Sequence, residues 1–282
     1  MTLPPVPDSF HWTREVWGTA LRCRLLDKAA QHLFTTRQLE LTARESWQAL
    51  GLSAGVAPDR FVTLNQVHGR HVVTIRRGID DAALAALQAD RPDADGVVSD
   101  DPNVAVVVRA ADCVPVLMAD RQRGAVGAVH AGWRGTAARV AVAAVEALGR
   151  EFGSRPADVM VAVGPAIGSC CYEVGPNVVD AFASAGHERY LIDRWFLAAP
   201  GPRGGFRPVP RVADAPRLRL DLPGANKDQL VLAGVPEHNI HVAGLCTAMH
   251  LDVLTSYRAE KDRAGRIAGV IRASQSGNRH RS

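Results

Sequence analysis

The segment from residue 114 to residue 152 constrains the fold more than any other part of the chain. VPVLMAD (114–120) and AVGAVHAG (125–132) are apolar runs with β-branched residues, and the turn-like DRQRG separates them. Such runs predict two strands. TAARVAVAAVEALGREF (136–152) then predicts a helix, with Thr136 placed to cap it. The order strand, turn, strand, helix indicates an α/β fold.

Strand signals also occur before this segment. Residues 61–76, FVTLNQVHGRHVVTIR, alternate apolar and polar positions, and residues 97–98 and 104–108 are rich in β-branched residues. Both patterns predict strands.

A second cycle follows the helix. We expect a strand at 159–168, a helix at 177–186, a helix within 226–235 that ends near Gly234, and a closing strand at 241–246. Residues 199–217 combine Pro, Gly and Arg without apolar periodicity, which predicts a surface loop. The polar residues 274–282 predict a frayed tail.

The composition argues against several classes of protein. The chain has 282 residues, of which 47% are hydrophobic, enough for one large α/β domain or two small ones. Lys and Arg number 33 against 29 Asp and Glu, and the arginines are scattered, so we expect no nucleic-acid partner. No stretch reaches the roughly 18 to 20 apolar residues of a membrane helix. The first residues also lack the order of a signal peptide, so we expect a cytoplasmic protein without a membrane partner.

Three short segments place reactive side chains among glycines: NQVHG (65–69), AADC (110–113) and HAGWRG (130–135). Each lies at or near a predicted strand end, where distant segments can converge on one pocket. Imidazole and thiolate are preferred zinc ligands, and three protein ligands with an open position are typical of catalytic zinc. His68, Cys113 and His130 supply such a set.

The spacing of these three residues matches no compact zinc-finger pattern, so spacing alone leaves an alternative open. In that alternative His68 and His130 are hydrogen-bonded at a strand end and in a turn, and Cys113 is a small buried hydrophobe. The five cysteines are odd in number and irregularly spaced, which argues against a disulfide framework and favours reduced thiols.

Several motifs in order resemble the laccase-domain family, once called multicopper polyphenol oxidoreductases and now associated with purine nucleoside phosphorolysis. The resemblance runs from about Leu33 to Ile271. The motifs are NQVHG, ADGVVSD (94–100), RAADCVPVLMAD (109–120), AVHAGWRGT (128–136), VGPAIGSCCYEVG (163–175), LDLPGANKDQL (220–230), GLCT (244–247) and SYR with GR (256–266).

The resemblance implies an α/β/β/α arrangement with two mixed sheets, and we expect residues 1–282 to form a single catalytic domain. It also implies a zinc ion held by His68, Cys113 and His130, with copper as the alternative metal. The implied reactions are phosphorolysis of adenosine, inosine and methylthioadenosine to a free base and ribose 1-phosphate, and hydrolytic deamination of adenosine. The implied partners are purine nucleosides and phosphate.

Two carboxylates and four arginines are candidates for the rest of the site. Asp112 and Glu173 are the candidate proton donors, and Asp112 is equally suited to orienting a ligand. Phosphate requires cationic donors, and Arg134 lies in GWRGT beside backbone amides at a predicted helix N-terminus. The other candidate arginines, in family-like segments, are Arg37, Arg109 and Arg258.

Two rival functions use the same residues. A cysteine near histidine and a carboxylate is also the pattern of a cysteine hydrolase, with Cys113 as nucleophile. The family resemblance adds the editing of cell-wall precursors, which would suit an amidase of this kind. Copper-dependent oxidation of phenols, for which the family was named, requires several copper centres, and the sequence has too few clustered histidines for them.

The remaining candidates are predicted to have bland roles. We expect Cys170 and Cys171 to shape a pocket wall, Cys246 to be buried, and His71 to point away from His68. Trp133 and Tyr172 suit either stacking on a purine or core packing. QLEL (38–41) replaces the glycines that usually follow a segment like FTTR (34–37), and Ala259 stands where the family usually has a second arginine, so the substrate side is expected to differ.

Overall fold

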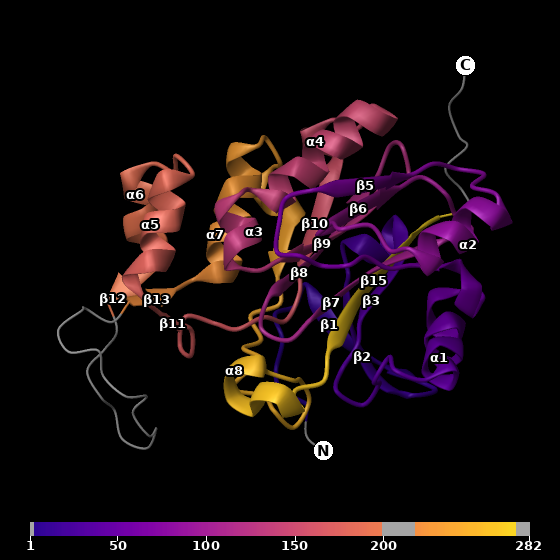
Figure 1. Cartoon of the computed structure of the whole chain (residues 1–282), viewed down its shortest axis with the longest axis horizontal. Coiled ribbons are helices and arrows are strands. Elements are labelled where there is room, and N and C mark those ends of the chain that lie inside the picture. Colours follow the sequence, from indigo (N-terminus) through magenta and orange to yellow (C-terminus); the bar gives the residue numbers. More distant parts are fainter. Residues whose placement is uncertain (1–2, 199–217, 275–282) are drawn as a thin grey trace.

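The computed structural model describes residues 3–198 and 218–274 (Figure 1). The predicted surface loop at 199–217 lies outside the described residues, as does the predicted tail at 274–282 apart from Ser274.

Two six-stranded sheets form the centre of the described structure. The first has the order β1 (Phe10–Glu15), β2 (Gly18–Cys23), β3 (Ala30–Phe34), β15 (Ile267–Ala273), β7 (Ala105–Ala110), β4 (Phe61–Val62). The second has the order β14 (Ile240–Val242), β10 (Val159–Val163), β8 (Val114–Asp120), β9 (Val126–Ala131), β6 (Gly96–Ser99), β5 (Val72–Ile75). A small sheet is formed by β11 (Glu173–Val174), β13 (Leu218–Leu220) and β12 (Phe196–Ala198). Both large sheets are mixed, because each contains parallel and antiparallel pairs.

Helices cover the outer faces of the two large sheets. The α-helices are α1 (Arg44–Ala54), α2 (Asp81–Ala89), α3 (Trp133–Ala137), α4 (Val140–Phe152), α5 (Pro176–Ser184), α6 (Arg189–Trp195), α7 (Leu222–Leu232) and α8 (Tyr257–Glu260). Helices α3 to α7 share a core with the second sheet, whereas α1 packs on the first (Figure 1). The order of layers is therefore α/β/β/α, as the family resemblance implied.

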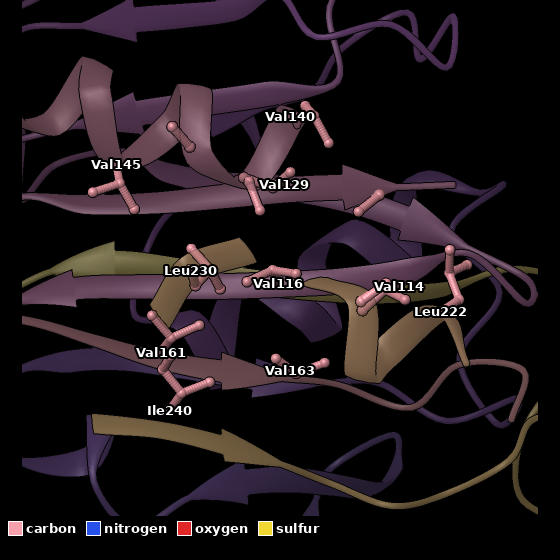
Figure 2. Packing of buried hydrophobic residues seen from close by; sticks show 14 of the residues in the cluster. Val114, Val116, Val129, Val140, Val145, Val161, Val163, Leu222, Leu230 and Ile240 are labelled. Atoms are coloured by element: carbon pink, nitrogen blue, oxygen red, sulfur yellow. The ribbon is translucent and has the colours of Figure 1, made fainter. Parts of the chain in front are cut away.

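Strand β8 explains why its segment is apolar throughout. Val114, Val116 and Met118 face the helices, while Leu117 and Ala119 on the alternate positions face the first sheet. Because successive side chains of a strand point to opposite faces, a strand covered on both faces needs apolar residues at every position. Figure 2 shows the helix side of this sheet, where side chains of α4 and α7 lie over the valines of the strands.

The two sheets approach each other closely at glycines. A Cβ atom on Gly164 would lie 2.3 Å from Cε1 of Phe34, and one on Gly269 would lie 3.2 Å from Cβ of Pro115. The ring of Phe34, from the first sheet, thus occupies the space beside the backbone that leaves β10 of the second.

Three predictions about the elements were wrong in detail. Thr136 does not cap a helix, because it lies inside α3, where its hydroxyl accepts a hydrogen bond from Asn226. A left-handed residue, Arg139 with φ 61°, divides the predicted helix into α3 and α4. The strand at 241–246 is not the closing strand, because β15 follows it and pairs with β3 and β7.

Histidine 32 gives the fold a pH-dependent stability. Its ring is 1% exposed, and Nε2 accepts a hydrogen bond from the backbone N–H of Cys23 at 2.8 Å. Burial lowers the pKa of His32 to about 4, although the carboxylate of Asp27 acts in the opposite direction. The folded state therefore binds the proton less readily than the unfolded chain, whose histidine has a pKa of about 6.5. The stability that follows from this difference is complete above about pH 6.5 and is lost as the pH falls toward about 4.

We expect the free energy of unfolding to fall by about 2 kcal/mol from this residue alone between about pH 7 and pH 5. Urea unfolding at both pH values measures it. The variant His32→Gln keeps an acceptor for Cys23 but cannot titrate, so it should show a smaller loss. Equal losses in the two proteins would contradict the assignment.

Candidate active site and metal centre

Three segments bring the predicted metal ligands together. His68 lies in the connection between β4 and β5, with φ 63°, and His130 is the penultimate residue of β9. Cys113 ends the short connection from β7 in one sheet to β8 in the other, directly after Asp112, whose φ is 89°. Because Pro115 of β8 is opposite His130 of β9, Cys113, two residues before Pro115, lies diagonally from His130 on the same face of the sheet.

The ligand atoms of His68, Cys113 and His130 all lie within 4.8 Å of one another. The two imidazole rings meet edge to face, with centroids 5.0 Å apart. His130 is buried, Cys113 half-buried and His68 exposed, so the cluster opens toward solvent on the side of His68.

Asp95, at the start of β6, is a site residue that sequence reasoning missed. Its carboxylate is fully buried and accepts hydrogen bonds from the backbone N–H groups of His68 (3.0 Å) and Gly69 (2.6 Å). It also binds Nδ1 of His130 at 2.8 Å, which leaves Nε2 of that ring for a ligand. Burial raises the pKa of Asp95, but these hydrogen bonds outweigh burial and lower it, so the carboxylate is ionised. The signal in the sequence was an acidic residue beside the buried run of the ADGVVSD motif.

Replacing Asp95 with asparagine is expected to weaken zinc binding by about 10- to 100-fold, because His130 loses the charge that orients its ring. Competition with a chromophoric chelator measures the affinity. Asp100→Asn is the matched control, because Asp100 also accepts a backbone hydrogen bond, from Arg77, but lies beyond the opposite end of β6. Equal zinc affinity in the Asp95 variant and the control would contradict this role.

The backbone behind the cluster leaves room for the ligands. A Cβ atom on Gly132 would lie 2.9 Å from Sγ of Cys113 and 2.9 Å from Cδ2 of His68, closer than side chains pack. One thiolate and two imidazoles are also the ligand chemistry that zinc accepts, and three ligands leave a position open. The residues present therefore fit a zinc ion.

Hydrogen bonds favour the thiolate form of Cys113. Burial raises the pKa of this thiol, but hydrogen bonds from His130 and His68 outweigh it and lower the pKa to about 7. For His130, burial acts to lower the pKa, and the hydrogen bonds to Asp95 and Cys113 raise it to about 9. The thiolate is the form of cysteine that binds a metal ion.

A cavity of about 1330 Å³ adjoins the cluster, and His68, Cys113 and His130 line it. Its other charged lining residues are Glu40, Arg91, Arg109, Asp112, Arg258, Lys261 and Arg266. Cations outnumber carboxylates there, so the cavity is suited to an anionic ligand.

The charges of two arginines of the cavity act on a third, Arg109. The pKa of the half-buried Arg109 is lowered by burial first and then by the positive charges of Arg91 and Arg266. None of the three makes an ion pair with a residue in the part of the chain that the structure describes. Gln66 holds the backbone of Arg109 in place with two hydrogen bonds, of 2.7 and 2.8 Å. We name Arg91, Arg109 and Arg266 the arginine cluster.

Asp112 and Tyr172 line the cavity near Cys113. Both oxygens of Asp112 accept hydrogen bonds, from the hydroxyl of Thr247 and from the backbone N–H of Arg258, each at 2.6 Å. This favours the positioning role over proton donation. Burial and then the charge of Cys113 raise the pKa of Tyr172 to about 12, so its hydroxyl is a hydrogen-bond donor at neutral pH. Arg258 lies over the ring of Tyr172, 5.2 Å from its centroid.

The structure places three of the predicted residues outside the cavity lining. Arg37 pairs with Glu260 at 3.0 Å, and Arg134 is exposed and stacks on Trp133 at 4.3 Å. Glu173 lies in β11, where its backbone carbonyl accepts a hydrogen bond from Arg258.

Sequence reasoning missed Arg91, Lys261, Arg266 and Glu40. Lys261 lies two residues after Ala259 and brings a cation to that end of the cavity, and Glu40 belongs to the divergent QLEL segment.

The other singled-out residues have distinct surroundings. His71 lies outside the cluster, with Nδ1 3.0 Å from the carbonyl oxygen of Asp93. Trp133 packs against the core beneath α3 to α7. Cys170, Cys171 and Cys246 lie together rather than apart. The helices of the described residues include none of the length and apolarity that crossing a membrane demands.

Comparison with known proteins agrees with these features. A purine nucleoside phosphorylase of Deinococcus radiodurans is 35% identical over 230 residues, covering 80% of this chain and 76% of that protein. The adenosine deaminase RL5, from an unknown prokaryotic organism, is 33% identical over 229 residues and 79% of each chain. The crystal structure of YlmD from Geobacillus stearothermophilus superposes with a TM-score of 0.75 at 28% identity, covering 95% of this chain and 100% of that one.

The model of a protein family described as multi-copper polyphenol oxidoreductase laccase matches residues 35–274. This match includes the metal-ligand cluster and every residue of the arginine cluster. The chain belongs to this laccase-like family, whose relatives include proteins named purine nucleoside phosphorylase.

Proposed function

We propose that this protein is a zinc-dependent purine nucleoside phosphorylase that cleaves adenosine, inosine and methylthioadenosine. The observation that carries the proposal is a single cavity lined by both the His68, Cys113 and His130 cluster and the arginine cluster. A metal centre beside arginines that form no ion pair within residues 3–198 and 218–274 suits a reaction between a neutral nucleoside and an anion. The names of the relatives support the same reaction.

The arginine cluster is the proposed phosphate site. Guanidinium groups bind phosphate through paired, charge-assisted hydrogen bonds. Arg109 is the central member, because its charge is half-buried and its backbone is held by Gln66. A bound phosphate would relieve the repulsion among the three cations.

In phosphorolysis a phosphate oxygen forms a bond to C1′ of the ribose while the bond from C1′ to N9 of the purine breaks. The purine leaves with the electron pair of that bond, and a proton from solvent or a donor completes the free base. Because negative charge develops on the purine, hydrogen-bond donors directed at it lower the barrier. Tyr172 is the proposed donor, since its hydroxyl stays protonated at neutral pH and its ring lines the cavity.

His68, Cys113 and His130 would hold the zinc ion, which supplies a Lewis acid to the polar groups of the substrate. Asp95 keeps the ring of His130 in the orientation that exposes Nε2. Asp112 fixes the segments of Thr247 and Arg258 against the cavity wall.

Deamination of adenosine is a second proposed activity of the same site, favoured by the 33% identity to a protein named adenosine deaminase. Deamination needs water instead of phosphate and therefore does not require the arginine cluster. The cell-wall amidase and the copper-dependent polyphenol oxidase remain the alternative functions, with less support than these two activities. Of the two candidate ligand groups among the described residues, only one contains histidine, so the described part of the chain lacks the several histidine-containing copper centres that phenol oxidation requires.

Incubation of the purified protein with each nucleoside, with and without phosphate, tests the proposal. We expect free base and ribose 1-phosphate, formed only when phosphate is present. Inosine alone from adenosine would leave deamination as the activity, and no product from any purine nucleoside would overturn the proposal. A UDP-linked muramoyl-serine substrate in parallel tests the amidase. Cys113→Ala is the negative control.

A further inference from the structure

A second group of potential metal ligands adjoins in sequence a residue that lines the cavity, Tyr172. Cys170 and Cys171 are in the loop after β10, and Cys246 is in the segment after β14. Backbone hydrogen bonds of Ala166 with Leu245 (3.2 Å) and Thr247 (3.0 Å) join the two segments. The positions of the cysteines are therefore fixed by the fold.

The three sulfur atoms lie within 4.8 Å of one another. A tight turn gathers them, because the N–H groups of Cys171 and Tyr172 both donate to the carbonyl of Gly168 at 3.0 Å. A Cβ atom on Gly168 would lie 3.3 Å from Sγ of Cys170 and 3.4 Å from Cβ of Cys246. Sulfur atoms that each bind one ion at about 2.3 Å are about 4 Å apart, so the group needs little rearrangement to surround an ion.

The thiols are graded in exposure, from the buried Cys246 through the half-buried Cys171 to the exposed Cys170. An ion could thus enter from solvent at Cys170 and reach the other two sulfurs. Burial and then the neighbouring sulfurs raise the pKa of Cys171 to about 12, and the pKa of Cys170 is raised for the same reasons. Reactive cysteines have lowered pKa values, so these two do not resemble nucleophiles or redox sensors.

We propose that Cys170, Cys171 and Cys246 form a second metal site, selective for a soft, thiophilic cation such as Cu(I). Three thiolates suit a soft cation, and a set of three sulfurs without a fourth ligand suits Cu(I) better than zinc, which takes four ligands in structural sites; the mixed set of His68, Cys113 and His130 suits zinc with an open position. Each thiol that binds the ion releases its proton to solvent, and the oxidation states of sulfur and metal do not change.

A bound ion would join two segments that each adjoin residues of the cavity or their partners. Cys171 directly precedes Tyr172, which lines the cavity, and Cys246 directly precedes Thr247, which holds Asp112. Since an ion that binds only the folded state stabilises that state, loading this site is expected to raise the unfolding temperature.

The test uses full-length protein carrying His68→Ala and Cys113→Ser, which removes the first site. Cu(I) is titrated anaerobically, with reduced thiols, against the colorimetric chelator bicinchoninate. We expect this protein to bind one equivalent of Cu(I) and to unfold at a higher temperature once loaded. Adding Cys170→Ser and Cys171→Ser should weaken Cu(I) binding by more than about a hundredfold, because direct ligands are lost, and should abolish the thermal shift.

Cys23→Ser in the same background is the matched control, because it removes one thiol that belongs to neither ligand group. Both replaced positions in the loop are at least partly exposed, and circular dichroism confirms that each variant is folded. Unchanged Cu(I) affinity after loss of Cys170 and Cys171 would overturn the proposal. A disulfide among the three cysteines after exposure to air, with no Cu(I) bound under reducing conditions, would overturn it as well. Zinc titration supplies the converse control. The equivalent of zinc that the unsubstituted protein binds should be lost in His68→Ala and retained in Cys170→Ser.

Discussion

Replacing Cys113 with serine is expected to abolish binding of the proposed zinc ion and to lower kcat for the proposed phosphorolysis about a thousandfold, which corresponds to about 4 kcal/mol of transition-state stabilisation. The hydroxyl of serine does not ionise near neutral pH, so the site loses the thiolate that anchors the ion between His68 and His130. Elemental analysis of protein purified without added metal measures the zinc, and initial rates with inosine and phosphate measure kcat.

A chelator distinguishes a metal ligand from a nucleophile at this position. If Cys113 holds zinc, removing the metal from the unsubstituted protein should abolish activity, and adding zinc back should restore it. Restoration should fail in the serine variant. Full activity of the metal-free protein would instead favour Cys113 as a nucleophile, as in the amidase alternative. Cys23→Ser is the control, because Cys23 is buried and belongs to neither candidate ligand group of the described residues.

Replacing Arg109 with alanine is expected to lower kcat/KM for phosphate by about a hundredfold or more, or about 3 kcal/mol. The reason is the loss of the half-buried guanidinium at the centre of the arginine cluster. Deamination of adenosine should change little, since that reaction uses no phosphate. Comparing the two activities therefore separates the effect of Arg109, which should appear in phosphorolysis alone, from an effect on the metal centre, which should appear in both.

Arg134→Ala is the matched control for Arg109→Ala, because Arg134 is exposed, stacks on Trp133 and lies outside the cavity lining. The phosphate saturation curve of Arg134→Ala should stay close to that of the unsubstituted protein. Equal losses in the two variants would show that net charge near the cavity, rather than contact with phosphate, sets the rate. An unchanged KM and kcat for Arg109→Ala would refute the proposed phosphate site.

The grouping of His68, Cys113 and His130 was predictable because each stands in a distinctive motif, and the structure brings the three together. Asp95 was not, although it lies in one of the quoted motifs, because its role depends on burial between β6 and two histidines from other segments. A sequence motif can indicate that a residue is important without showing which groups that residue contacts.

The arginines show what local sequence cannot tell. Arg37 and Arg109 lie in similar family-like segments, yet Arg37 is neutralised by Glu260 and only Arg109 lines the cavity. The direction of a side chain depends on partners far along the chain, which no motif encodes. The same holds for Arg91 and Arg266, whose charges act on Arg109 although Arg266 lies far from it along the chain.

Strand prediction succeeded where both faces of a strand are buried, as in β8, because the whole run is apolar. It failed for β1, where half-buried and exposed positions dilute the signal. It also failed for β15, which is buried at nearly every position but carries Gly269 and Arg272 within its short run. The prediction that Thr136 caps a helix was wrong for another reason. Thr136 lies within α3, and its hydroxyl accepts a hydrogen bond from Asn226.

The place of β15 in its sheet has a consequence for the order of events during synthesis. This strand lies between β3 and β7, so the first sheet remains in two parts until residues 267–273 have left the ribosome. Pairings between such distant segments are slow to form, because a long loop must close before any contact is made. Arg266, directly before β15, joins the cavity at the same late stage. The first sheet is thus expected to close only once β15 has been synthesised, and the same step brings Arg266 to the other two members of the arginine cluster.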